Sequence, residues 1–171
     1  YSSKTKKTKK MSKALLILFA VCVLPALASA RFVSSPFKVV GPVYCDTCRC
    51  GYETEATKYL AGATVRIECR NGKTAEVTYT KSGVTDATGK YEILVNTDRG
   101  DEICDVVLVK SSDPQCAQAN AGRDRARIIL TRNNGMTSDT RFANAMGFLA
   151  NTPLASCTEI LKKYQETEED I

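Results

Sequence analysis

The sequence predicts a mainly β fold: a single antiparallel β-sandwich or partly closed barrel of six to seven strands, with one C-terminal helix. Three observations lead to this prediction. Short stretches of alternating apolar and polar residues are separated by turn residues at regular spacing, as in sandwiches and barrels. Residues 153–164 carry apolar side chains at the three- and four-residue steps of an amphipathic helix. Seven cysteines follow the N-terminal leader, which is enough for three disulfides and one unpaired thiol.

Residues 1–30 are expected to precede the folded domain. Residues 1–10 form a lysine-rich tract ahead of Met11 and are interpreted as non-native sequence or an upstream leader. Residues 11–30 have the pattern of a secretory signal peptide, with a positive start, a fourteen-residue apolar run and an Ala-Ser-Ala cleavage site. The run is too short to span a bilayer, which takes roughly twenty residues. We therefore expect residues 31–171 to form one secreted, extracellular domain with no membrane span.

The positive charge of the chain belongs to this leader. The whole chain has a net charge of +5, from 24 basic and 19 acidic residues. Residues 1–30 contain six lysines and no acid, so residues 31–171 retain 18 basic and 19 acidic residues, a net charge of −1. A nucleic-acid partner is therefore not predicted.

The first expected strand covers residues 37–44 and is interrupted by Gly41 and Pro42. Proline cannot donate to a strand ladder, which predicts an edge position or a bulge there. Residues 51–60 are predicted to form a polar loop in which Tyr52 and Tyr59 act as packing anchors.

The central stretch gives the clearest strand signals. Residues 64–69 alternate so that Val65, Ile67 and Cys69 share one face. Asn71-Gly72 then predicts a hairpin into residues 75–80. Two further strands are expected, and they cover residues 91–95 and 104–110.

The C-terminal third is expected to contain a short strand at residues 125–130, a last strand at 141–144 and the helix at 153–164. The connection between the last strand and the helix is expected to supply three core contacts, Met146, Phe148 and Leu149. The helical spacing places five residues on its buried face: Leu154, Cys157, Ile160, Leu161 and Tyr164.

The composition favours a protein that is not an enzyme. The chain contains no histidine, which removes Ser-His-Asp and Cys-His nucleophilic catalysis. The carboxylates Asp101, Glu102 and Asp105 lie in polar contexts and are interpreted as solvated surface. No cofactor-binding motif is present, and neither a cofactor nor a metal is predicted.

Three cysteines, Cys45, Cys48 and Cys50, fall within six residues. A structural zinc site needs four ligands, usually in two close pairs, whereas the later cysteines are single and widely spaced. A redox Cys-x-x-Cys motif needs a helix N-terminus, and residues 49–52 give no helical run. Structural half-cystines are therefore favoured, and the residues alone leave the pairing of six cysteines open among fifteen connectivities.

A basic run, Arg123, Arg125 and Arg127, alternates along an expected strand. It is interpreted as a solvent-exposed face whose arginines pair with Asp124 or neighbouring acids. Its alternative role is an interaction face for an anionic polysaccharide or a receptor.

Several segments in the same order resemble the olive-pollen major allergen (Ole e) family of secreted plant pollen proteins. The resemblance covers essentially all of residues 37–164, and the Arg-Asp-Arg-Ala-Arg run is most similar to the grass-pollen members. The segments that carry it are Gly41-Pro42-Val43-Tyr44-Cys45-Asp46-Thr47-Cys48-Arg49, Gly62-Ala63-Thr64-Val65, Thr85-Asp86-x-x-Gly89-x-Tyr91, Glu102-Ile103-Cys104-Asp105, Asp113-x-x-Cys116, Asn144-x-x-Gly147-Phe148 and Pro153-Leu154-x-x-Cys157.

The resemblance implies a fold and a disulfide set. Two of the segments, Gly62–Val65 and Thr85–Tyr91, also resemble prealbumin-like Greek-key modules, which supports the sandwich. Cys50 stands where the family usually has a small residue, so it is expected to be unpaired, to mispair with Cys48 or to link two chains. The implied disulfides are Cys45–Cys116, Cys48–Cys157 and Cys69–Cys104.

The resemblance also implies a function. It indicates a secreted, non-enzymatic protein of the pollen-allergen type, acting as a protein-interaction or signalling module in pollen hydration or pollen-tube growth. The implied partner is a cell-surface receptor, with receptor kinases as one class. The alternative is a cell-wall carbohydrate-binding module that uses the Arg123–Arg127 run or Tyr52 and Tyr59. A monomer is expected, with a disulfide dimer through Cys50 as the other option.

Overall fold

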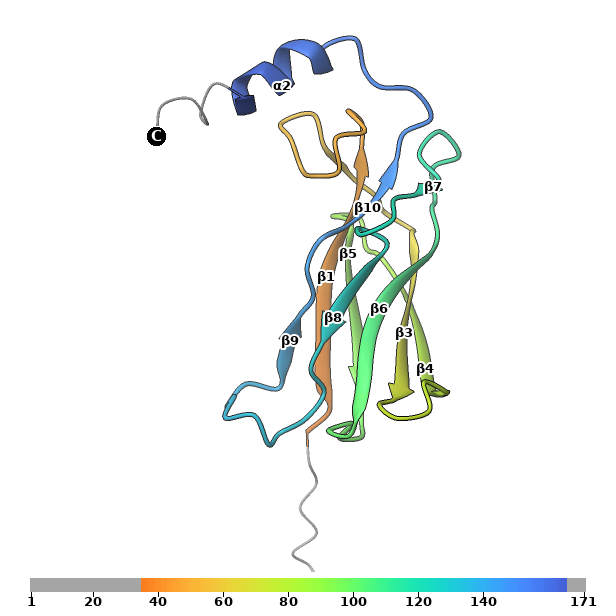
Figure 1. Cartoon of the computed structure of the whole chain (residues 1–171), viewed down its shortest axis with the longest axis vertical. Coiled ribbons are helices and arrows are strands. Elements are labelled where there is room, and N and C mark those ends of the chain that lie inside the picture. The colour runs from red at the N-terminus through yellow and green to blue at the C-terminus, as the bar shows by residue number, and fades with distance from the viewer. Residues whose placement is uncertain (1–34, 166–171) are drawn as a thin grey trace, which may run out of the picture. The chain divides into compact units, whose positions relative to one another are not determined.

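The computed structural model describes residues 35–165. The expected leader, the expected signal peptide and the last residues of the acidic tail lie outside this range. Figure 1 shows the strands and the helix near the C-terminus. In chain order, the elements are β1 (Phe37–Asp46), β2 (Lys58–Tyr59), β3 (Thr64–Asn71), β4 (Val77–Val84), β5 (Lys90–Val95), β6 (Glu102–Lys110), β7 (Gln118–Ala119), β8 (Arg125–Ile128), β9 (Thr140–Phe142), β10 (Met146–Leu149) and α2 (Cys157–Gln165).

The strands form two sheets. One sheet is antiparallel in the order β4-β3-β6-β8. The other is built around β1, which pairs with β5 and β9 along its first half and with β2 and β10 along its second half. Alternate side chains of both sheets meet in one apolar core, as period-two burial requires. Its members include Phe37, Val39, Val65, Ile67, Tyr91, Ile93, Val95, Val106, Ile128 and Phe148.

The predicted sandwich with a short C-terminal helix and three disulfides is confirmed, and the sheets do not close into a barrel across residues 35–165. The described part of the chain has ten strands rather than six or seven. The additional ones are short: β2, β7 and β10, the last of which holds the predicted core residues Met146 and Phe148. The pairing is not antiparallel throughout, because β1 runs parallel to both β9 and β10.

The expectation of an edge or a bulge at Gly41 and Pro42 is wrong. β1 lies in the middle of its sheet, paired with β5 through Pro42 on one side. On the other side β9 ends opposite Val40 and β10 begins opposite Val43. Pro42 therefore lies between these two partner strands, where a missing N–H breaks no ladder.

Two glycines leave room for buried tyrosine rings. A Cβ added at Gly41 would lie 2.5 Å from the Tyr91 hydroxyl, and one at Gly147 would lie 2.6 Å from the Tyr44 ring. Both tyrosines are at most 2% exposed. The rings pack against backbone where any other residue would carry a side chain.

Gly41→Ala is accordingly expected to lower the free energy of unfolding by about 1–3 kcal/mol, the usual cost of overpacking a core. Urea denaturation measures this loss. Gly72→Ala is the matched control, because its Cβ would meet its nearest atom at an ordinary 3.6 Å, and it should change stability by less than about 0.5 kcal/mol. Equal stability of the two variants would contradict the tight packing at Gly41.

The helix α2 begins at Cys157, four residues later than predicted. Cys157 and Ile160 are buried, but Leu154 and Tyr164 are each 42% exposed. The buried face of the helix is therefore narrower than the sequence predicts. Leu154 lies before the first helical residue, and its N–H donates to the Thr47 carbonyl instead of to a carbonyl of a helical turn. No helix within residues 35–165 combines the length and the apolar character needed to cross a membrane.

Candidate functional site

The cysteine cluster lies at the end of β1 and joins it to two distant segments. Cys45 is bonded to Cys116, which precedes β7, and Cys48 is bonded to Cys157 in α2. The third disulfide joins Cys69 and Cys104, which face each other on the neighbouring strands β3 and β6 of one sheet. These are the pairs that the resemblance implies. Among the described residues, Cys50 is the free cysteine.

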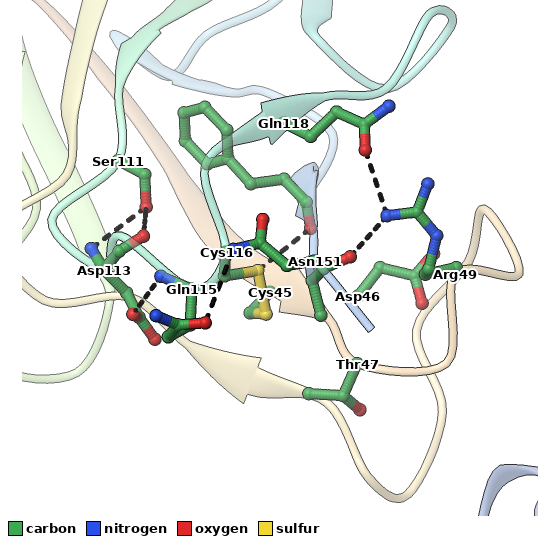
Figure 2. Close-up of a disulfide and its surroundings, with 12 residues drawn as sticks. Cys45, Asp46, Thr47, Arg49, Ser111, Asp113, Gln115, Cys116, Gln118 and Asn151 are labelled. Carbon is green, nitrogen blue, oxygen red and sulfur yellow. Dashed lines mark hydrogen bonds between the residues drawn. A yellow bond between two sulfur atoms is a disulfide. The ribbon is translucent and has the colours of Figure 1, made fainter. Parts of the chain in front are cut away.

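A buried carboxylate organises the turn that carries these cysteines. Asp46 is 2% exposed, and its carboxylate accepts hydrogen bonds from the N–H groups of Cys48 (3.1 Å) and Gly51 (2.6 Å). Arg49 adopts the left-handed region, with φ 56°. Its guanidinium donates to the Gln118 side-chain oxygen and the Ala150 carbonyl (Figure 2). Sequence reasoning missed the role of Asp46, although an aspartate that begins a turn is a common acceptor for the N–H two residues on.

Asp46→Ala is expected to lower the free energy of unfolding by about 2–4 kcal/mol, because it leaves two backbone N–H groups without their acceptor. Asp46→Asn keeps one oxygen and should lose less. Chemical denaturation of the three proteins measures the difference. An alanine variant as stable as the wild type would contradict the role assigned to this carboxylate.

A cleft of about 190 Å³ lies beside the Cys45–Cys116 disulfide. Figure 2 shows the surroundings of this disulfide. Two side chains that line the cleft are engaged within the loop: Asp113 Oδ1 accepts the Gln115 N–H at 2.8 Å, and Gln115 Oε1 accepts from the Asn151 amide at 3.4 Å. The volume is below the roughly 300–1,000 Å³ of ordinary small-molecule sites. The cleft therefore does not support a substrate pocket. Its lining consists of Cys45, Thr47, Lys58, Asp113, Gln115, Cys116, Ala150, Thr152 and Leu154.

The predicted basic face is only partly assembled. Arg125 and Arg127 share the outer side of β8, with side chains 54% and 61% exposed. They pair with Asp105 on β6 rather than with Asp124, and the Arg127 Nε–Asp105 Oδ1 distance is 2.6 Å. Arg123 precedes β8 and donates from Nε to the Gly51 carbonyl at 2.7 Å. The three arginines therefore do not form one surface: Arg125 and Arg127 share an ion pair with Asp105, and Arg123 contacts a loop.

The interpretation of the acidic residues as solvated surface is wrong for two of them. Asp105 is 8% exposed, because the two arginines of β8 cover it. Glu102 forms an ion pair with Arg99 at 3.2 Å. Glu102 also lies close to the sulfurs of Cys69 and Cys104, but those two sulfurs are bonded to each other and are not available as metal ligands.

The two predicted tyrosine anchors behave differently. The Tyr52 ring packs edge-on against the Tyr164 ring of α2, with 5.6 Å between the ring centroids. Tyr59 is 54% exposed and donates its hydroxyl hydrogen to Glu53 Oε1 at 2.7 Å. Tyr59 is therefore not a core anchor.

The short strand β9 reverses the burial that its sequence suggests. Arg141 is 3% exposed and Phe142 is 80% exposed. The Arg141 guanidinium stacks 4.8 Å from the centroid of the Phe37 ring. It also donates to four backbone carbonyls, those of Ile129 (2.8 Å), Thr131 (3.0 Å), Thr140 (3.3 Å) and Ser138. These bonds satisfy the buried charge and force Phe142 to the opposite side of the strand.

Phe142 thereby becomes part of an apolar surface that we call the outer face, formed by Val40, Pro42, Leu94 and Phe142 on β1, β5 and β9. Phe142 is in register with Val40, and the neighbouring row places Leu94 beside Lys38. Lys38 and Glu92 form an exposed ion pair at 2.8 Å across this face. Sequence reasoning missed the outer face, because a Phe next to an Arg in a strand is ordinarily the buried one of the two.

These features define a disulfide-stapled β-sandwich whose described residues offer an exposed apolar sheet face and no small-molecule-sized pocket at the cysteine cluster. The family model described as "Pollen protein Ole e 1 like" matches residues 35–165, and the chain belongs to this family. The three disulfides and the family are compatible with secretion.

Similar proteins come from several plants. "Protein DOWNSTREAM OF FLC" of Arabidopsis thaliana is 44% identical over 90% of this chain and 94% of its own length. "Pollen allergen Che a 1" of Chenopodium album is 41% identical with the same coverage. "Pollen-specific protein C13" of Zea mays, a grass, is 41% identical over 90% of this chain and 91% of its own length. The solved structure of the major plantain pollen allergen Pla l 1 matches with a TM-score of 0.66 and 31% identity, covering 72% of this chain and 100% of that one.

Proposed function

We propose that this chain is a secreted, non-enzymatic extracellular protein that acts by binding another protein through its outer face. The observation that carries the proposal is the reversed burial in β9. A charged side chain occupies the interior and a phenylalanine is left 80% exposed. Local departures from the expected pattern tend to occur at functional sites, because folding stability alone does not favour them.

The outer face suits protein binding. Aromatic side chains that become fully desolvated contribute most strongly to interfaces, and a polar rim surrounds them. Phe142 supplies the exposed ring, Val40 and Leu94 extend the apolar area, and Lys38 and Glu92 supply polar groups. β1 and β9 are held by ladder pairing and by the buried Arg141, so that little ordering of this surface would accompany binding.

We infer that the partner is a cell-surface receptor, with receptor-kinase ectodomains as the first class to test, and that the process is pollen hydration or pollen-tube growth. Support for the tissue comes from relatives named as pollen-specific or anther-specific proteins. A monomer with one such surface is sufficient for this role.

The proposal is tested by measuring binding of the purified chain to a panel of receptor-kinase ectodomains from pollen and pistil. Saturable binding to at least one ectodomain is expected, with hydrogen-exchange protection in β1, β5 and β9. Absence of binding across the panel, or protection confined to β4 and β8, would count against it.

The second candidate is a cell-wall carbohydrate-binding module at Arg125 and Arg127. The observation that favours it is the exposure of both arginine side chains, at 54% and 61%. Asp105 weakens it, because this carboxylate already pairs with both arginines. Titration with acidic oligosaccharides tests this second candidate function. Salt-sensitive binding that is lost in the Arg125→Gln/Arg127→Gln variant would support carbohydrate binding, and the absence of binding would exclude it.

A further inference from the structure

Three cysteines, Cys48, Cys50 and Cys157, belong to a small cluster at the base of α2. Cys48, Cys157 and Ile160 form a buried group separate from the main core, and Cys50 packs against it. The Cys50 Sγ lies 3.7 Å from Asp46 Oδ1, the oxygen that also accepts the Cys48 N–H at 3.1 Å. One carboxylate oxygen thus holds a free thiol beside the backbone of a disulfide-bonded cysteine.

The other two disulfides have different surroundings. Cys45, Cys116, Cys69 and Cys104 all belong to the main core and are at most 4% exposed. Cys50 packs against neither of these bonds. Among the cysteines of residues 35–165, the nucleophile and the electrophile of a thiol–disulfide exchange therefore come together at Cys48–Cys157.

We propose that the Cys48–Cys157 disulfide exchanges with Cys50. The Cys50 thiolate attacks the Cys157 Sγ, a Cys50–Cys157 bond forms, and the Cys48 Sγ leaves as a thiolate. Cys48 takes up from solvent the proton that Cys50 released. One disulfide and one thiol are present before and after the step, which requires neither oxidant nor reductant.

Attack at Cys157 is favoured over attack at Cys48. A Cys48–Cys50 bond would close a ring across Arg49 alone, and disulfides tolerate few geometries. A Cys50–Cys157 bond keeps α2 attached, so the helix retains its contacts with this loop, the Tyr52–Tyr164 ring pair and the Lys163–Glu55 ion pair.

The exchange moves the attachment point of α2 by two residues along the loop. In the structure, the Leu154 N–H donates to the carbonyl of Thr47, the residue before Cys48. Leu154 and Thr47 both line the cleft beside the Cys45–Cys116 disulfide. The two disulfide isomers therefore differ in the wall of this cleft.

The surroundings of Cys50 keep the exchange slow at neutral pH. Burial raises the pKa of its thiol and nearby Asp46 raises it further, against an opposing backbone hydrogen bond at Tyr52. The other titratable groups that interact with Cys50 are Tyr44 of β1 and Tyr52, and Tyr164 of α2 contacts the latter. Because the thiolate is the nucleophile, the exchange accelerates as pH rises.

Trypsin provides a direct test, because Arg49 separates the two candidate thiols into residues 39–49 and 50–58. The secreted chain is incubated in mildly alkaline buffer, quenched with acid, labelled with a maleimide and digested without reduction. With longer incubation, less label is expected on Cys50 and correspondingly more on Cys48. A Cys50–Cys157 linked peptide should appear in step with this change.

Two variants control the experiment. Cys50→Ser has no free thiol among the described cysteines and should keep Cys48–Cys157 without label. Cys50→Ser/Thr137→Cys moves the thiol to an exposed loop position and should also leave all three disulfides intact. The proposal is overturned if label stays on Cys50 throughout, if Cys48–Cys50 is the product, or if the Thr137→Cys protein exchanges equally fast.

Discussion

Replacing Cys45 and Cys116 together by alanine is expected to lower the free energy of unfolding by about 4 kcal/mol. The two residues are 71 positions apart, and closing a loop of that length restricts the unfolded chain by roughly this amount. Both half-cystines lie in the main core, at 4% and 1% exposure, so their removal acts on the whole sandwich. Urea denaturation of the purified variant and wild type measures the loss.

The Cys48→Ala/Cys157→Ala variant provides the matched comparison. Its residues are 109 positions apart, so chain entropy alone predicts at least the same cost. The cluster around this bond contains few buried residues, and we expect α2 to detach locally while the sandwich stays folded. The helical circular dichroism signal should fall with a smaller change in sandwich stability. An equal loss of global stability in both variants would show that α2 is part of the cooperative core.

Phe142→Asp is expected to weaken binding to the receptor partner by about 30-fold or more, which corresponds to roughly 2 kcal/mol, the scale of an interface hot spot. The physical reason is that a carboxylate would replace the exposed ring that β9 contributes to the outer face. Because Phe142 is 80% exposed, the stability of the free protein should change by less than about 0.5 kcal/mol. Surface plasmon resonance and urea denaturation on the same preparations separate the two effects.

Val77→Asp is the control for this prediction. Val77 is 48% exposed at the start of β4, in the other sheet, and it gains the same charge. Its affinity for the partner should match that of the wild type. If Val77→Asp and Phe142→Asp weaken binding equally, the effect is one of net charge and the outer face has no special role.

Local patterns predicted the strands that alternate strongly. The stretches 64–69 and 91–95 match β3 and β5, whose inward residues Val65, Ile67 and Ile93 are buried. β2 and β7 have two residues each, too few to show a period. The parallel pairing of β1 with β9 and β10 joins segments about a hundred residues apart, and nothing local specifies it.

The functional residues were predicted unevenly for the same reason. The cysteines are visible in the sequence, but their pairing follows from the family and not from spacing. The burial of Arg141 depends on the carbonyls of Ile129, Thr131 and Ser138, which converge once the preceding loop has folded. The exposure of Phe142 is a consequence of that convergence, and a strand pattern read residue by residue cannot reveal it.

Placing a photo-crosslinking phenylalanine analogue at position 142 tests the protein-binding account most directly. In pollen and pistil surface extracts, we expect one dominant cross-linked receptor. Excess wild-type protein should abolish this product, and excess Phe142→Asp protein should leave it unchanged. No cross-linked protein, or a product that both competitors abolish equally, would contradict the assignment of the outer face as the binding surface.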